Sequence, residues 1–139
     1  MRQHQETIRI QTRGKALSDI TREVQSIVDD SGIETGMCHT FLRHTSASLL
    51  IQENADPDVL LDLENFLSKL VPENDPDFFH NAEGPDDMPA HIRTALTHTS
   101  EQIPIARKRL FLGIWQGIYL WEHRHRSHVR ELVVHIFGN

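Results

Sequence analysis

Three of the ten histidines stand at junctions between predicted elements, where a reactive site is easiest to build. His44, His80 and His91 each lie beside polar or turn residues, 36 and 11 residues apart along the chain. Neutral imidazole is a common ligand of borderline metal ions, and three histidines, or histidines with a carboxylate, form the usual open catalytic site. The spacing matches no compact ligand motif. The alternative is that each is a loop histidine bonded to a backbone carbonyl.

The segment His44–Ser48, with the sequence HTSAS, combines one imidazole with three hydroxyl groups directly after a predicted strand. Hydroxyls at the end of a strand can bind a phosphate or position a nucleophile. A serine hydrolase would use Ser46 or Ser48, but the GxSxG turn that exposes such a nucleophile is missing. The segment therefore favours phosphate binding over a serine nucleophile.

Acidic and amide side chains gather before two predicted helices. The two sets are Glu53, Asn54 and Asp56, and then Glu83, Asp86 and Asp87. Acids stabilise helix N-termini through the macrodipole, and for Asp56, which precedes Pro57, a capping role is sufficient. The same carboxylates could instead hold a hard cation such as Mg²⁺, which would in turn bind a phosphate.

The most aromatic stretch, Trp115–Trp121, runs directly into Glu122, His123 and Arg124. An aromatic wall beside an arginine suits a flat heterocycle that carries a phosphate, because the guanidinium group binds phosphate as a planar fork. The same stripe could equally be a subunit interface or a second core.

The apolar pattern predicts the elements that must position these side chains. Alternation predicts strands over residues 7–12, 37–42, 48–52, 109–112, 117–123 and 129–137. Helical spacing predicts three helices, which begin at Ser18, Pro57 and Pro89, with a long loop over residues 73–87. The last strands are predicted to form an antiparallel meander. The fold class is therefore α+β, with two or three helices against a mainly antiparallel, sandwich-like sheet.

Two helix faces are predicted to be ordinary core. The helix after Pro57 carries an apolar stripe that ends at Leu70, and the helix after Pro89 turns Ile92, Ala95 and Leu96 inward.

Length and charge limit the function. A chain of 139 residues predicts one domain, spanning residues 1–139. The net charge of −6 divides into an acidic middle, where residues 53–87 hold eleven acids and only Lys69, and a basic C-terminal part. The acidic middle would repel nucleic acid. The single Cys38 excludes an internal disulfide and is predicted to be buried. Without an apolar stretch of about 20 residues, no membrane span is predicted, and the expected location is cytoplasmic.

Five strings occur in the order HTSASLLIQENADP, LVP, EGPDDMPAHI, IPI and WQGIYLWEHR. Together they resemble the YjbQ family, whose members are called secondary thiamine-phosphate synthase enzymes. The resemblance implies a compact α+β domain with a β-sandwich core, assembled as a homotrimer with sites near the subunit interfaces. It also implies a secondary ability to join the pyrimidine diphosphate and thiazole phosphate precursors of thiamine, with release of pyrophosphate.

The resemblance matches family motifs at the residues singled out above, and on this basis we assign them expected roles. The catalytic residues would be His44, Glu83 and Glu122. Substrate and phosphate would be bound by Thr45, Ser46, Asn54, Trp115, Gln116 and Arg124. A divalent ion, Zn²⁺ or Mg²⁺, would be held by His44, His80 and His91, alone or mixed with Asp56 and Glu83.

Two departures from the family pattern concern substrate handling. Lys108 stands where the family usually has a glycine, which is expected to disfavour a positive φ there. Ile114 replaces a threonine, so one hydroxyl group that could bond the substrate is missing.

Three hypotheses follow. The first is a metal-assisted transferase of the thiamine-phosphate synthase type, in which the protein neutralises the pyrophosphate leaving group and aligns two rings. The second is a metal-dependent hydrolase of a small phosphorylated metabolite. The third is a trimeric protein that binds such a ligand without turnover.

Overall fold

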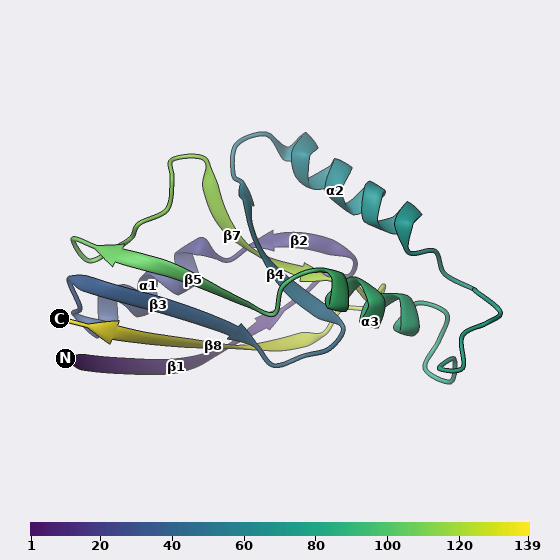
Figure 1. The fold of residues 1–139 in the computed structure, drawn as a ribbon, viewed down its shortest axis with the longest axis horizontal. Helices are drawn as coiled ribbons and strands as arrows, with labels where there is room; N and C mark the ends of the chain where they lie inside the picture. The colour runs from purple at the N-terminus through teal and green to yellow at the C-terminus, as the bar shows by residue number, and fades with distance from the viewer.

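Strands that are distant in the sequence pair in two antiparallel sheets in the computed structural model, which describes residues 1–139 (Figure 1). The five-stranded sheet has the order β1-β8-β3-β5-β6, and the three-stranded sheet has the order β2-β7-β4. The elements in chain order are β1 Arg2–Gln11, β2 Ala16–Asp19, α1 Thr21–Ser31, β3 Thr35–Leu42, β4 Ala47–Glu53, α2 Pro57–Leu70, α3 Asp87–Leu96, β5 Ser100–Ala106, β6 Arg109–Leu110, β7 Gln116–Glu122 and β8 Val129–Gly138. Three helices with antiparallel sheets confirm the predicted α+β class.

The predicted C-terminal meander is wrong, because the last strands do not pair in sequence order. β7 lies between β2 and β4 in the smaller sheet, whereas β8 lies between β1 and β3 in the larger one. The sequence does not predict β2 or β5; β2 has only four residues, and β5 has seven but contains a proline. Alternation of apolar residues identifies the buried face of a strand, but it does not identify the partner strand.

The core lies between the two sheets and α1. It contains 17 buried apolar residues, among them Val24 and Val28 of α1, Leu120 of β7 and Val134 of β8. Cys38 of β3 is fully buried in this core, as predicted, and burial raises the pKa of its thiol to about 12. This thiol is therefore neutral and does not act as a nucleophile at physiological pH.

α1 begins at Thr21 rather than at the predicted Ser18. Residues 16–19 pair with β7 as β2, so Ser18 belongs to a strand and cannot cap a helix. The first turn is instead held by Asp19, whose Oδ1 accepts hydrogen bonds from the backbone N and the hydroxyl of Thr21 at 2.9 and 2.6 Å. Gly32 ends the helix in the left-handed conformation, with φ of 68°.

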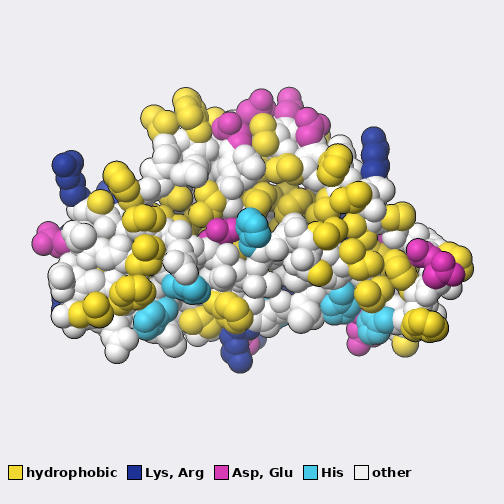
Figure 2. All heavy atoms as spheres, viewed as in Figure 1, with side chains coloured by type: hydrophobic (Ala, Val, Ile, Leu, Met, Phe, Trp, Pro, Cys, Tyr) yellow, Lys and Arg dark blue, Asp and Glu magenta, His cyan; other side chains and the backbone are white.

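α2 begins as predicted, but its apolar stripe is not ordinary core. Asp56 caps the helix by accepting a hydrogen bond from the backbone N of Asp58 at 3.0 Å, and Pro57 takes the first position. Only Leu67 of the helix is buried, whereas the side chain of Phe66 is 67% exposed. α2 stands away from the larger sheet (Figure 1), and hydrophobic side chains gather on the surface around it (Figure 2).

α3 begins at Asp87 and buries a different face from the predicted one. Pro89, Ala90, Arg93 and Thr94 are buried, whereas Leu96 is 59% exposed. The buried Arg93 reaches the C-terminal end of α2, where its Nη2 donates to the carbonyl of Val71 at 3.1 Å. A guanidinium group at a helix C-terminus is favoured by the macrodipole. None of the three helices combines the length and apolar character that a membrane span requires.

The turn between β5 and β6 keeps a positive φ even though it contains no glycine. Arg107 and Lys108 have φ angles of 54° and 65°. Their backbone is held by neighbouring segments, since Lys108 N donates to the carbonyl of Glu34 at 3.1 Å and Gln25 Nε2 donates to the carbonyl of Lys108 at 3.1 Å. Lys108 thus adopts the positive φ that lysine is expected to disfavour, and these bonds hold it there.

Candidate metal site

One group of side chains has the composition and spacing of a metal site. His80, in the loop before α3, meets Asp87 and His91 of α3, and their ligand atoms all lie within 4.8 Å of one another. Asp87 and His91 are four residues apart and so share one face of the helix. Their closest contacts converge on one oxygen, since Asp87 Oδ2 lies 2.6 Å from His80 Nε2 and 3.1 Å from His91 Nε2.

Neighbouring groups orient two of the three ligands. Nδ1 of His91 lies 2.9 Å from the carbonyl oxygen of Thr45, which can only accept, so Nδ1 carries a hydrogen and Nε2 is the nitrogen that faces the ligand group. Asp87 Oδ1 accepts a hydrogen bond from Arg124 Nη1 at 2.6 Å, which leaves Oδ2 for the two histidines. The Nε2 atoms of His80 and His91 are thus already directed toward Asp87 Oδ2, and a metal ion would take the place of the hydrogens that they share with this oxygen.

The electrostatic environment keeps Asp87 ionised. Burial raises the pKa of Asp87, but the hydrogen bond from His80 and the charge of Arg124 outweigh burial and hold the pKa at about 2. For Asp86, burial acts in the same direction and is likewise outweighed by hydrogen bonds from Arg124 and from the backbone N of His125, so its pKa is also lowered. Two imidazole nitrogens with one carboxylate fit Zn²⁺ or a similar transition metal better than Mg²⁺, which prefers oxygen ligands.

Arg124, which the sequence suggests for phosphate binding, is occupied by acidic neighbours. Its Nε donates to Asp86 at 3.0 Å, its Nη1 donates to Asp87, and its Nη2 donates to the carbonyl of Glu83 at 3.0 Å. The carboxylate of Glu83 is exposed, and its Oε2 lies 3.6 Å from His80 Nε2. Glu83 therefore borders the metal group without belonging to it.

His44 and Asp56 lie outside the His80/Asp87/His91 group. His44 Nε2 accepts a hydrogen bond from the backbone N of Glu131 at 2.7 Å, and its Nδ1 lies 3.4 Å from Arg130 Nη1. Burial and the charge of Arg130 lower the pKa of His44. Asp56 is the cap of α2. The structure thus brings together two of the three predicted histidines, joined by Asp87 instead of His44.

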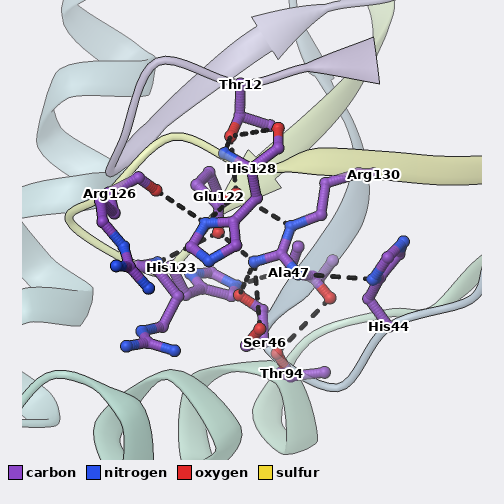
Figure 3. Close-up of polar contacts among 12 residues, drawn as sticks. Thr12, His44, Ser46, Ala47, Thr94, Glu122, His123, Arg126, His128 and Arg130 are labelled. Atoms are coloured by element: carbon purple, nitrogen blue, oxygen red, sulfur yellow. Dashed lines mark hydrogen bonds and ion pairs between the residues drawn. The ribbon is translucent and has the colours of Figure 1, made fainter. Parts of the chain in front are cut away.

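A buried network that contains Glu122 (Figure 3) is linked to this site through Arg124. Glu122 is only 1% exposed and forms a two-point ion pair with Arg130. Its Oε1 also accepts from the hydroxyl of Thr12 at 2.7 Å, and its Oε2 accepts from the backbone N of Arg124 at 3.1 Å. Arg130 Nη2 in turn donates to Ser46 Oγ at 3.0 Å. Glu122 is thus placed to hold Arg124 and Arg130 in position.

Asn54, Trp115 and Gln116 lie at the opposite end of the smaller sheet. Gln116 pairs with Glu53 in the β4–β7 register, whereas Glu122 pairs with Ala47. Six residues of strand separate the two ends by roughly 20 Å. Asn54 Nδ2 donates to the carbonyls of Ile114 and Gln116 at 3.1 and 3.2 Å. Within one chain these residues do not meet the His80/Asp87/His91 group.

Part of the aromatic stripe forms a second core, which was one of the open alternatives. Trp121 packs with Leu67 and Val71, and its Nε1 donates to Glu64 at 3.2 Å. Ser48 and His123 are both fully buried, and Ser48 Oγ lies 2.8 Å from His123 Nε2. Burial lowers the pKa of His123 to about 3. Because this pair has no access to solvent, Ser48 cannot serve as a nucleophile for a substrate.

A cavity of about 400 Å³ adjoins the metal group. His80 forms part of its wall, together with Asn74, Phe78, Asn81 and Met88 from the long loop and the start of α3. It is large enough for a small organic molecule. The wall includes the carboxylate of Asp75 but no lysine or arginine.

Sequence reasoning missed the central place of Asp87 and the role of Arg130. The DxxxH spacing of Asp87 and His91 was a usable signal, because residues four apart meet on a helix. Arg130 gave no such signal, since its partners Ser46 and Glu122 come from different strands.

These features define a small α+β protein with two antiparallel sheets and a histidine–aspartate cluster where α3 meets the smaller sheet. The family described as "UPF0047 protein YjbQ-like" matches residues 6–139, and the chain belongs to this family. UPF0047 protein sll1880 of Synechocystis is 59% identical over 99% of this chain and 93% of its own length. UPF0047 protein YjbQ of Escherichia coli O157:H7 is 36% identical over 97% of this chain and 98% of its own length.

Solved structures agree with this assignment. An uncharacterized conserved protein of the YjbQ/UPF0047 family from Clostridium acetobutylicum is 36% identical, with a TM-score of 0.83 over 96% of this chain and 99% of its own. The conserved hypothetical protein TT1486 of Thermus thermophilus is 32% identical, with a TM-score of 0.83 over 92% of this chain and 97% of its own.

Proposed function

We propose that this chain is a metal-dependent enzyme that acts on a small phosphorylated metabolite, with His80, Asp87 and His91 as the metal ligands. The observation that carries the proposal is the convergence of three ligand atoms within 4.8 Å, with His91 and Asp87 each oriented by a further hydrogen bond. A divalent ion, when bound there, would supply positive charge for phosphate oxygens and could activate water.

The reaction proposed first is the transfer that the family resemblance suggests, in which a pyrimidine diphosphate and a thiazole phosphate form thiamine phosphate. In this reaction the difficult step is the departure of pyrophosphate, so a site that neutralises phosphate oxygens is its main requirement. The cavity beside His80 is proposed to hold a ring, since its wall offers Phe78, the amides of Asn74 and Asn81, and no cation that would compete for the phosphate.

Hydrolysis of a phosphate ester is the second candidate, and one observation favours it. The side chains of His80 and His91 are 44% and 32% exposed, so the ligand group is open on one side, as in sites that admit water. The homotrimer and the cytoplasmic location predicted from the sequence stay predictions.

Metal binding is the first test. Full-length protein should bind Zn²⁺ in competition with a chromophoric chelator, and His91→Ala should weaken binding at least about 100-fold, because it removes a ligand and leaves two. His98→Ala is the matched control, because His98 is an exposed histidine outside the group. Equal Zn²⁺ affinity in His91→Ala and wild type would refute the site.

Activity is the second test. Zn²⁺-loaded protein is incubated with the two thiamine precursors, and separately with a panel of phosphate monoesters. Thiamine phosphate that is lost in His91→Ala but kept in His98→Ala supports the transferase, and inorganic phosphate with the same dependence supports the hydrolase. Metal binding with neither product would contradict the enzyme proposal and favour the ligand-binding protein.

A further inference from the structure

Two hydrogen-bond donors face each other where His44 meets Arg130 (Figure 3). Nη1 of Arg130 lies 3.4 Å from Nδ1 of His44. A guanidinium nitrogen can only donate, so this contact is a hydrogen bond only if His44 Nδ1 is the accepting nitrogen. The tautomer of His44 therefore decides what the pair can bind.

A second contact fixes the tautomer. His44 Nε2 lies 2.7 Å from the backbone N of Glu131, which carries a hydrogen and can only donate. Nε2 must then be the accepting nitrogen, and the neutral ring carries its hydrogen on Nδ1. His44 Nδ1–H and Arg130 Nη1–H are thus both donors, and neither has another partner in the chain.

Further donors surround this pair. Ser46 Oγ accepts from Arg130 Nη2 at 3.0 Å, so its own O–H remains to donate, and the hydroxyl group of the exposed Thr45 follows His44 directly. The nearby carboxylates are already paired. Glu122 holds the other edge of Arg130, and Glu131 pairs with Arg43 at 3.0 Å. No acceptor of the chain itself therefore satisfies these donors.

We propose that His44, Ser46 and Arg130 form an anion site that binds a phosphate group of the substrate. One phosphate oxygen between His44 Nδ1 and Arg130 Nη1 would satisfy both donors at once, and a second oxygen would accept from Ser46. Arg130 is only 4% exposed, so the anion reaches the site from the side of the partly buried His44 ring. A charge-assisted hydrogen bond of this kind is among the strong ones in proteins.

The anion site deepens the proposed function, because it names the group that binds the phosphate part of the substrate. It adjoins the metal group through Thr45, whose carbonyl accepts from His91. It also assigns to Arg130 the phosphate-binding role that the sequence suggests for Arg124. The Nε, Nη1 and Nη2 atoms of Arg124 already donate hydrogen bonds to Asp86, Asp87 and Glu83. In contrast, Nη1 of Arg130 has a hydrogen without an acceptor.

The test uses metal-free, full-length protein and inorganic phosphate as the probe, so that it does not depend on the metal site. Phosphate titration followed by ¹⁵N NMR should shift the His44 ring and Arg130 side-chain signals in a saturable way. Calorimetry should show at least about tenfold weaker phosphate binding in the double variant Glu122→Gln/Arg130→Met. This variant removes both charges of the ion pair, so no unpaired buried charge remains.

Arg43→Ala is the matched control, because it removes a nearby exposed arginine but not the facing donors. Phosphate binding should change less than about twofold in this variant. Equal weakening in Arg43→Ala and in the double variant, or signals that shift at His80 and His91 but not at His44, would overturn the anion site. The wild-type titration decides the question even if the double variant does not fold. If the wild-type protein does not bind Zn²⁺, the proposed metal enzyme is refuted, but the result of the phosphate titration still stands.

Discussion

The two ends of the β4–β7 pair both carry polar side chains, but these are charged and buried at one end and neutral and exposed at the other. At the end that meets α3, Glu122 and Arg130 are buried, ion-paired to each other and bonded to Thr12 and Ser46. At the other end, Asn54 and Gln116 are exposed and bond the backbone of the adjoining loop. The buried ion pair therefore supports a site at one end, whereas the exposed amides only shape a loop at the other.

The difference lies in what each end leaves available. At the α3 end the buried pair satisfies most of its own hydrogen bonds, and the facing donors of His44 and Arg130 are left without an acceptor. A group held by a buried network has little freedom, so it is pre-organised for a ligand. At the other end Trp115 is 61% exposed and nothing in the chain covers it.

The largest effect is expected from breaking the buried ion pair. Arg130→Met leaves the carboxylate of Glu122 buried without its partner, and removal of one member of such a pair costs about 3–5 kcal/mol. Urea unfolding measures this loss. Arg43→Ala, which removes an exposed ion pair of the same residue types, should change stability by less than about 0.5 kcal/mol. A similar small loss in both variants would mean that burial does not distinguish the two pairs.

A smaller effect is expected from pH, through His123. Its pKa is about 3 in the folded chain, against about 6.5 when unfolded. Between these values the unfolded chain binds a proton that the folded chain does not. The contribution of His123 to the free energy of unfolding is therefore constant above about pH 6.5 and falls by about 1.4 kcal/mol per pH unit below it. This slope should be measured between pH 6 and 4.5, because at lower pH the protonation of Asp87 lowers the stability further.

His123→Gln should remove most of this slope, since glutamine does not take up a proton. The remainder belongs to His44, whose pKa is also lowered. Urea unfolding at several pH values measures the slope, and His98→Gln, at an exposed histidine, serves as the control. An unchanged slope in His123→Gln would show that its imidazole is not the group that titrates.

The smallest effects are expected at the opposite end of the sheet. Asn54→Ala loses two hydrogen bonds to the backbone at an exposed position and should cost about 1 kcal/mol. Trp115→Ala should cost less than about 0.5 kcal/mol, because its side chain is mostly exposed. Neither should alter Zn²⁺ affinity by more than about twofold. A large loss of metal binding in either variant would show that the two ends are coupled.

Much of the secondary structure could be predicted because its signals are local. Asp56 and Pro57 mark the start of α2, Gly32 marks the end of α1, and alternation marks β3, β4, β7 and β8. The order of strands could not be predicted, since alternation selects a face and not a partner. The exposure of Phe66 and Leu96 could not be predicted either, because the same helical stripe fits a buried or an uncovered face.

For the site, the sequence by itself determined which residues could do chemistry, among them His80 and His91, but it placed Asp87 in a loop rather than on the helix of His91. Only the tertiary structure decided which of them meet. It joined His80 to Asp87 and His91, placed His44 beside Arg130, and separated Gln116 from Glu122 by about 20 Å along the strands. The physical reason is that ligand geometry and ion pairing depend on contacts between segments far apart in the chain, which residue types and spacing do not specify.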